Sequence, residues 1–134
     1  MILRNLYLPL LISLLFFPLG VTSANAFSLS FAWGSIPKCT SGKPNRVSNP
    51  QFKLSGVPEG TTKIKFKMVD RNVPSYRHGG GTVKFSGQKT ISPGAFKYKS
   101  PCPPSGRHTY EWTATAIGKG NKNLGVAKSS KKYP

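Results

Sequence analysis

HTYEWTATA, residues 108–116, gives the clearest indication of the fold class, because apolar and polar side chains alternate along it. Tyr110, Trp112 and two alanines occupy every second position, and threonines or Glu111 stand between them. Successive side chains of a β-strand point to opposite faces of the sheet, so this period predicts a strand with one buried and one wet face. Helix signals are almost absent from the rest of the sequence. We therefore predict an all-β fold with few or no helices.

Further short runs on either side of this stretch show the same alternation. They are residues 27–33, 51–54, 63–68, 83–85, 96–98 and 124–126. Clusters of glycine, proline and asparagine, which favour turns, separate these runs. Short alternating strands predict antiparallel sheets, and an antiparallel β-sandwich is the usual way for such sheets to bury their apolar faces.

The first 26 residues differ from the rest of the chain. Arg4 is followed by an apolar run over 6–19 and by small residues at 24–26, which is the pattern of a secretory signal peptide. The alternative is a membrane anchor, but the strongly apolar part is about a dozen residues long and contains two prolines, whereas a spanning helix needs ~20 residues. We therefore expect residues 1–26 to be cleaved and residues 27–134 to form one periplasmic or secreted domain that does not span a membrane.

The chain is strongly basic, with 20 Lys and Arg against three Asp and Glu. Nucleic acid is the usual partner of such a protein, but an exported protein instead meets anionic lipid headgroups and envelope polyanions, so we expect no nucleic-acid partner. Alternatively, the charge serves only solubility. We interpret Lys63, Lys65 and Lys67 as the solvated face of one strand and residues 118–134 as a basic, mobile C-terminal tail.

Cys39 and Cys102 are the only cysteines of the chain. An even pair in an oxidising compartment predicts a disulfide. The alternative is a metal site that combines them with His78 and His108. No close ligand pair such as Cys-x-x-Cys is present, so the zinc signal is weak and we expect no metal.

Side chains with acid–base chemistry are few and cluster in two segments. Asp70 and His78, with Asn72 and Tyr76 between them, follow one predicted strand, and His108 begins another. Imidazoles and phenols donate hydrogen bonds to anions, and an aspartate beside a histidine orients the ring and favours its protonated form. Alternatively, the histidines only cap loops. No carboxylate pair, nucleophile elbow or phosphate-binding loop accompanies them, so we expect binding without catalysis or a cofactor.

Two segments of the chain have the form of known family motifs. Residues 50–61, PQFKLSGVPEGT, resemble the segment SP-x-x-x-x-SGVPEGT, and residues 101–110, PCPPSGRHTY, resemble the loop GPCPPSGxHRY. Both motifs are those of the phosphatidylethanolamine-binding protein family, also called Raf-kinase-inhibitor-like proteins. The resemblance extends from about residue 39 to residue 110 and loosely to the end. It implies a sandwich of two antiparallel sheets and a small pocket for phosphate-type anions such as a phospholipid headgroup.

The resemblance also implies which residues bind the ligand. Residues 70–74 are similar to the family motif DPDxP, His78 to the pocket histidine that follows it, and residues 108–110 to HRY. Together with the prolines of the second motif, the implied pocket residues are Asp70, Asn72, Pro74, His78, Pro101, Pro103, Pro104, His108 and Tyr110.

The sequence departs from the family pattern at several of these positions. Arg71 and Asn72 replace a proline and an aspartate, Gly79 stands where a tryptophan is usual, and Thr109 replaces an arginine. The loss of one acid and the gain of Arg71 favour a dianion in the pocket. We therefore predict an exported, non-enzymatic binding protein for a phospholipid headgroup or related phosphate ester. The alternative is an interaction protein whose basic surface binds envelope polyanions or inhibits another secreted protein.

Overall fold

The structure, a computed structural model, describes residues 20, 26–40 and 43–134, so the predicted signal peptide lies almost entirely outside the described residues. The described part is built from β-strands and one short 3-10 helix, η1. In chain order they are β1 (Ser28–Ala32), β2 (Arg46–Ser48), β3 (Gln51–Ser55), β4 (Lys63–Asp70), β5 (Gly80–Lys84), β6 (Thr90–Ile91), β7 (Lys97–Lys99), β8 (His108–Ile117), η1 (Lys119–Asn121) and β9 (Asn123–Tyr133). None of the described helical segments is long and apolar enough to cross a membrane.

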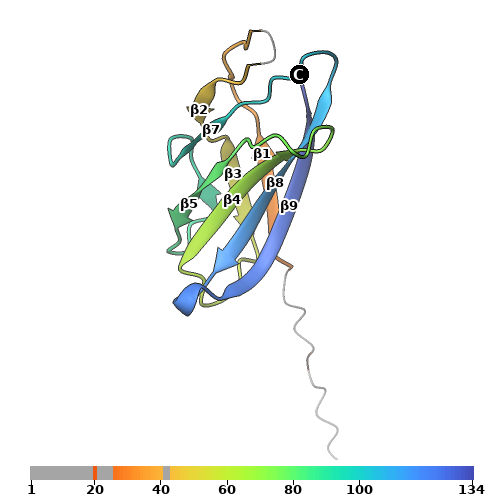
Figure 1. Ribbon diagram of the computed structural model, residues 1–134. Coiled ribbons are helices and arrows are strands. Elements are labelled where there is room, and N and C mark those ends of the chain that lie inside the picture. Colours follow the sequence, from red (N-terminus) through yellow and green to blue (C-terminus); the bar gives the residue numbers. More distant parts are fainter. Residues whose placement is uncertain (1–19, 21–25, 41–42) are drawn as a thin grey trace, which may run out of the picture.

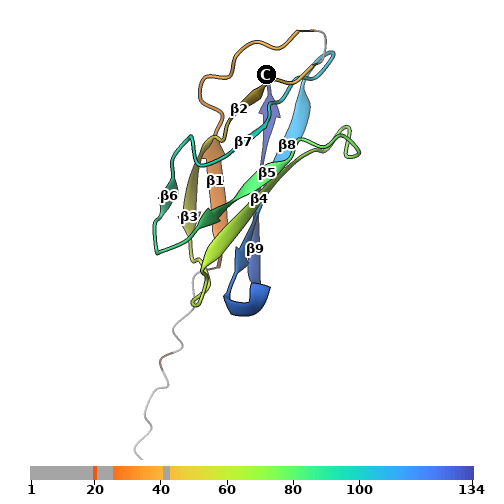
Figure 2. The same cartoon turned by 60° about the vertical axis from the view of Figure 1, so that its left-hand side comes forward.

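All neighbouring strands pair antiparallel, as the alternating sequence predicted. The largest sheet has the order β5-β4-β8-β9, a second has the order β1-β3-β6, and β2 pairs with β7. In Figure 2, β6, β3 and β1 lie to one side of β5, β4 and β8. The sheets approach each other where β1 runs beside β9 and β5 beside β7. The prediction of an all-β, antiparallel fold with almost no helix is therefore confirmed.

The core forms where the inward faces of the two larger sheets meet. Trp112 of β8 and Phe66 of β4 are buried on one side, and Phe52 of β3 is buried on the other. The Phe52 ring stacks on Phe66 with 4.4 Å between centroids and meets Trp112 edge-on at 5.1 Å. Burial of each large side chain contributes roughly 1.5–3 kcal/mol, so this aromatic cluster fixes the two sheets against each other.

The C-terminal segment corrects one prediction. Residues 118–134 are not a mobile tail for most of their length, because β9 pairs with β8 from Asn123 to Tyr133. The Tyr133 ring meets Trp33 edge-on at 5.6 Å, and the Trp33 indole N–H donates to the Lys132 carbonyl at 3.0 Å. The strand is hard to recognise from sequence because it lies at a sheet edge, where lysines and serines replace apolar residues.

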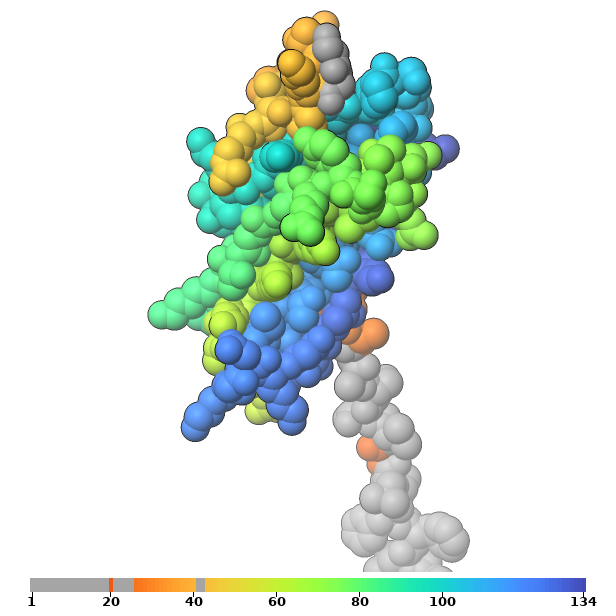
Figure 3. All heavy atoms as spheres, in the orientation of Figure 1, coloured from red at the N-terminus to blue at the C-terminus, as the bar shows by residue number. Residues whose placement is uncertain are grey.

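The fold brings two loops together at one end of the molecule. β4 ends there at Asp70 and β8 begins there at His108, so the loop over 71–79 and the loop over 100–107 are neighbours. Figure 1 shows both near the C terminus, at the end opposite to the start of β1. In the space-filling view they form one continuous surface, green and cyan in Figure 3. Every residue of the predicted ligand site lies at this end.

Candidate functional site

The pairing of β4 with β8 positions the central residues of the candidate site. Asp70 is the register partner of Tyr110, and both are buried on the inward face. His108 precedes Tyr110 by two positions and therefore points to the same side. Its Nδ1 lies 2.7 Å from Oδ2 of Asp70 and donates a hydrogen bond to the carboxylate. Strand pairing thus converts a separation of 38 residues into direct contact.

Both oxygens of the Asp70 carboxylate accept hydrogen bonds from the protein. Its Oδ1 accepts the backbone N–H groups of Asn72 at 2.9 Å and Val73 at 3.2 Å, while Oδ2 receives His108. Burial by itself would raise the pKa of Asp70, but these hydrogen bonds outweigh burial, and the pKa is lowered. Asp70 is therefore a charged group that orients the His108 ring and shapes the turn after β4.

His78, in the loop over 71–79, is held by the end of β7. Its side chain is buried, and its Nδ1 donates to the Lys99 carbonyl at 2.7 Å. The ring meets Tyr110 edge-on, with 5.5 Å between centroids, and lies 4.7 Å from the ring of Tyr76. Burial lowers the pKa of His78, although the bond to Lys99 and the charge of Asp70 partly oppose this. The imidazole is therefore neutral at pH 7 and carries its proton on Nδ1.

These side chains surround a cavity of about 220 Å³, which we call the small pocket. Burial, followed by the negative charge of Asp70, raises the pKa of Tyr110 far above its ordinary value, so the phenol keeps its proton. The volume suits a compact group such as a phosphate ester, since pockets for drug-sized ligands measure about 300–1,000 Å³. The residues that line the small pocket are Pro44, Asp70, Val73, Tyr76, His78, Cys102, Pro104, His108 and Tyr110.

Five of the nine predicted ligand residues line this pocket: Asp70, His78, Pro104, His108 and Tyr110. Asn72 lies behind it, where its Oδ1 accepts the Thr109 backbone N–H at 2.8 Å and ties the loop to β8. Pro74 lines the neighbouring hollow. Pro101 is buried beneath the rim, and Pro103 lines neither cavity.

Four lining residues were not among the predicted ligand residues. Two of them could have been predicted from the sequence. Tyr76 lies between Asp70 and His78, and Cys102 lies among the prolines of the second family motif. Val73 contributes through the turn that Asp70 caps. Pro44 carried no signal, because it comes from a distant loop that only the tertiary fold brings to the pocket.

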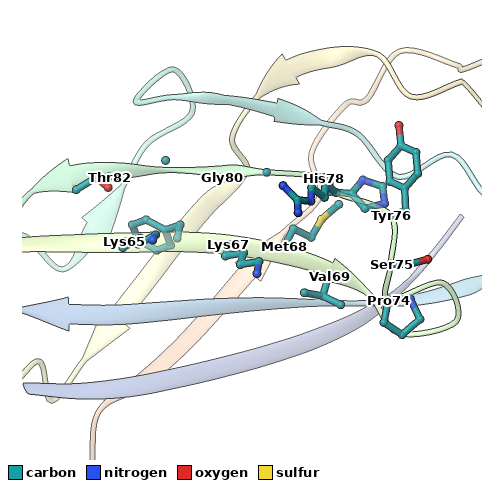
Figure 4. A pocket seen from close by; sticks show the side chains of 14 residues that line it. Lys65, Lys67, Met68, Val69, Pro74, Ser75, Tyr76, His78, Gly80 and Thr82 are labelled. Carbon is teal, nitrogen blue, oxygen red and sulfur yellow. The ribbon is translucent and has the colours of Figure 1, made fainter. Parts of the chain in front are cut away.

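A second hollow of about 640 Å³ lies along β4 and β5 next to the small pocket. Lys65, Lys67 and Arg77 line it together with the backbone of Gly79–Gly81, and we call it the basic groove. Figure 4 shows Lys65 and Lys67 along one strand and His78 and Tyr76 at the end of the other. Tyr76 and His78 line both hollows, so the groove and the pocket share a wall.

The predicted disulfide is present between Cys39 and Cys102, whose Cα atoms are 5.9 Å apart. It ties the segment before β2 to the pocket rim, because Cys102 lines the small pocket. The bond uses both sulfur atoms, so the zinc site that the sequence left as an alternative cannot be built from these cysteines.

Comparison with known proteins supports the architecture. A search against family models and a search of curated proteins each return no match. Among solved structures, the chain is similar to the crystal structure of a phosphatidylethanolamine-binding protein homologue from Chlamydia trachomatis. The TM-score is 0.56 at 16% sequence identity, over 82% of this chain and 98% of that chain. The chain therefore has the fold that the sequence motifs implied.

Proposed function

We propose that this chain is an exported binding protein that holds the phosphate group of a small molecule or phospholipid headgroup in the small pocket. The observation that carries this proposal is the hydrogen bond between Asp70 and His108. It fixes the His108 ring by its Nδ1 and leaves Nε2 for a ligand. With Nδ1 held by Asp70, it is the doubly protonated ring that can donate from Nε2 to an anion.

The other walls of the small pocket complement this arrangement. His78 uses its Nδ1–H for the Lys99 carbonyl, so its Nε2 can accept the proton of a singly protonated phosphate ester and donates to an anion only when the ring is protonated. The Tyr110 phenol remains protonated and is a hydrogen-bond donor. Asp70 itself need not contact a bound anion, because both of its oxygens accept hydrogen bonds from the protein.

We propose binding rather than catalysis at this site. An Asp–His pair can act as a general base, and for covalent catalysis it then needs a nucleophilic side chain within hydrogen-bond reach. Among the residues that the structure describes, neither a serine nor a threonine lines the small pocket, and its cysteine, Cys102, is held in the disulfide. Export is supported by the signal-like residues 1–26 and by the disulfide, which persists in oxidising compartments.

Calorimetric titration with O-phosphoethanolamine tests the proposal. His78→Ala, His108→Ala and Tyr110→Phe should each weaken binding about 10-fold or more, because a hydrogen bond to a charged ligand contributes roughly 1.5–3 kcal/mol. Lys53→Gln is the control, since Lys53 is exposed on β3 in the other sheet. If both histidine variants bind like the wild type, the proposal is wrong.

A further inference from the structure

We propose that the basic groove is a second anion subsite, so that the ligand carries at least two separated anionic groups. One group would occupy the small pocket, and the other would contact Lys65, Lys67 and Arg77. The inference rests on the proposed function and specifies its ligand as a bis-phosphate or a longer polyanion. It also gives a role to the lysines of β4, which by sequence alone are only a solvated strand face.

The charge of the groove has one sign. Lys65, Lys67 and Arg77 are exposed and line it, and no acidic residue is among its lining residues. Lys65 and Lys67 are two positions apart on β4, so both point to the same face. Clustered cations beside a low-dielectric wall focus a positive potential and raise the local concentration of anions.

Within the described part of the chain, these two lysines have no counter-ion. Asp70 pairs with His108, and Glu111 pairs with Arg71 at 2.8 Å and lies 3.9 Å from Lys128. The third acid of the chain, Glu59, lies in the turn before β4, away from the groove. Repulsion between the lysines is therefore not relieved by the described residues, and an anionic ligand would relieve it.

The β5 wall of the groove is bare backbone only at Gly80, the register partner of Lys67, whereas Thr82, the partner of Lys65, places a side chain there. A Cβ at Gly80 would lie 1.9 Å from the carbonyl oxygen of Phe66, and one at Gly81 would lie 2.4 Å from the Phe96 ring. Both positions therefore need glycine, because β5 runs too close to its neighbours for a side chain. Gly80 therefore leaves the β5 backbone uncovered beside Lys67, whereas a side chain at Gly81 would point inward, toward Phe96.

The groove and the small pocket adjoin at the loop over 71–79, and because Lys65 and Lys67 point to the face of β4 opposite to Asp70, a bridging ligand would have to pass around this loop. Tyr76 and His78 line both, and Tyr76 is 38% exposed at the boundary. A ligand anchored by one phosphate presents its second anion to the groove at a high effective concentration. The small pocket alone, at about 220 Å³, suits one phosphate group, whereas the groove of about 640 Å³ gives room for an extended chain.

Alkyl phosphates are suitable probes because spacer length can be varied without other chemistry. We would titrate the wild type with butyl phosphate and with alkane bisphosphates of increasing spacer length. At the best spacer, the bisphosphate should bind at least about tenfold more tightly than the monophosphate. The Lys65→Gln/Lys67→Gln variant should lose this gain while its affinity for butyl phosphate changes less than about twofold.

The matched control is Lys84→Gln/Lys128→Gln. It removes two exposed lysines from the outward face of the same sheet, so the net charge falls equally, but neither residue lines the groove. His108→Ala should weaken both probes, because both are anchored in the small pocket. Equal loss in the two lysine variants would mean a general charge effect and would overturn the inference.

The remaining outcomes separate the two proposals. If butyl phosphate binds and depends on His108 but no spacer improves affinity, the second subsite is wrong and the proposed function stands. If neither probe depends on His108, the proposed function is wrong, and the inference that rests on it fails as well.

Discussion

Oδ2 of Asp70, at the end of β4, lies 2.7 Å from Nδ1 of His108, at the beginning of β8. This hydrogen bond joins the two loops that form the small pocket and aims the free edge of an imidazole into it. Asp70 also accepts the backbone N–H groups of Asn72 and Val73 and so holds the turn after β4. Loss of its carboxylate should therefore affect both the stability of the folded protein and the binding of a ligand.

Asp70→Asn should lower the free energy of unfolding by about 1–3 kcal/mol at pH 7, because the amide replaces a charged acceptor. The lowered pKa of Asp70 means that this stabilisation is present above its ordinary pKa of 3.8 and is lost as the pH falls through the lower folded value. Urea unfolding at pH 7 and pH 3 measures both effects. The difference between variant and wild type should shrink at pH 3, and equal stability at pH 7 would contradict the role of Asp70.

His78 should make the protein less stable in mild acid. Its pKa is lowered by burial, so the unfolded chain takes up a proton before the folded protein does. The stability is therefore complete above the ordinary pKa of 6.5 and decreases as the pH falls through the folded value. His78→Gln should flatten the dependence of the urea midpoint on pH between 7 and 5, and an unchanged slope would contradict this interpretation.

Anion binding should strengthen as the pH falls from about 8 to 5.5, because both Nδ1 atoms are bonded within the protein and Nε2 can donate to an anion only from a protonated ring. Sulfate is the appropriate probe, since its charge stays constant where a phosphate ester would itself titrate. We expect an increase in affinity of about tenfold, measured by calorimetry. The His78→Ala/His108→Ala variant should lack the increase, and retention of the full increase would exclude the histidines as its source.

Reduction of the disulfide should destabilise the domain by about 4 kcal/mol, because Cys39–Cys102 closes a loop between residues 63 positions apart. Differential scanning calorimetry with and without reductant measures the effect, and a Cys39→Ala/Cys102→Ala variant should match the reduced wild type. Because Cys102 lines the small pocket, reduction should also weaken phosphate binding below the melting temperature. Two titratable thiols in protein unfolded without reductant would contradict the bond.

The exported protein should begin at Phe27. Ala24 and Ala26 have the small side chains expected before a cleavage site. In addition, Ala26 is exposed, whereas Phe27 is half-buried against the core, so cleavage after Ala26 retains the first packing residue. Mass spectrometry of exported protein measures the terminus, and Ala24→Arg/Ala26→Arg should block processing. A mature chain that retains Met1 would contradict the prediction.

Local patterns were sufficient to predict most of the strands. The alternation around Trp112 and Phe66 identified both the strands and their buried faces, because the side-chain direction in a strand depends only on position along the chain. β2 and β6 were missed, since three and two residues are too few to show a period. β9 was recognised only around Leu124 and Val126, because its pairing with β8, rather than its composition, makes the rest of it a strand.

Local sequence patterns were enough to predict the all-β class, the cysteine pair and the residues from which a site could be made. Which of these residues meet depends on the tertiary fold. Asp70 reaches His108 because β4 and β8 pair in one register, Pro44 joins the pocket from a distant loop, and Pro103 is excluded from it. The physical reason is that alternation and turn chemistry are local properties, whereas sheet register and loop packing arise from contacts between distant segments. The basic groove has the same origin, since Lys65, Lys67 and Arg77 become one surface only when β5 folds against β4.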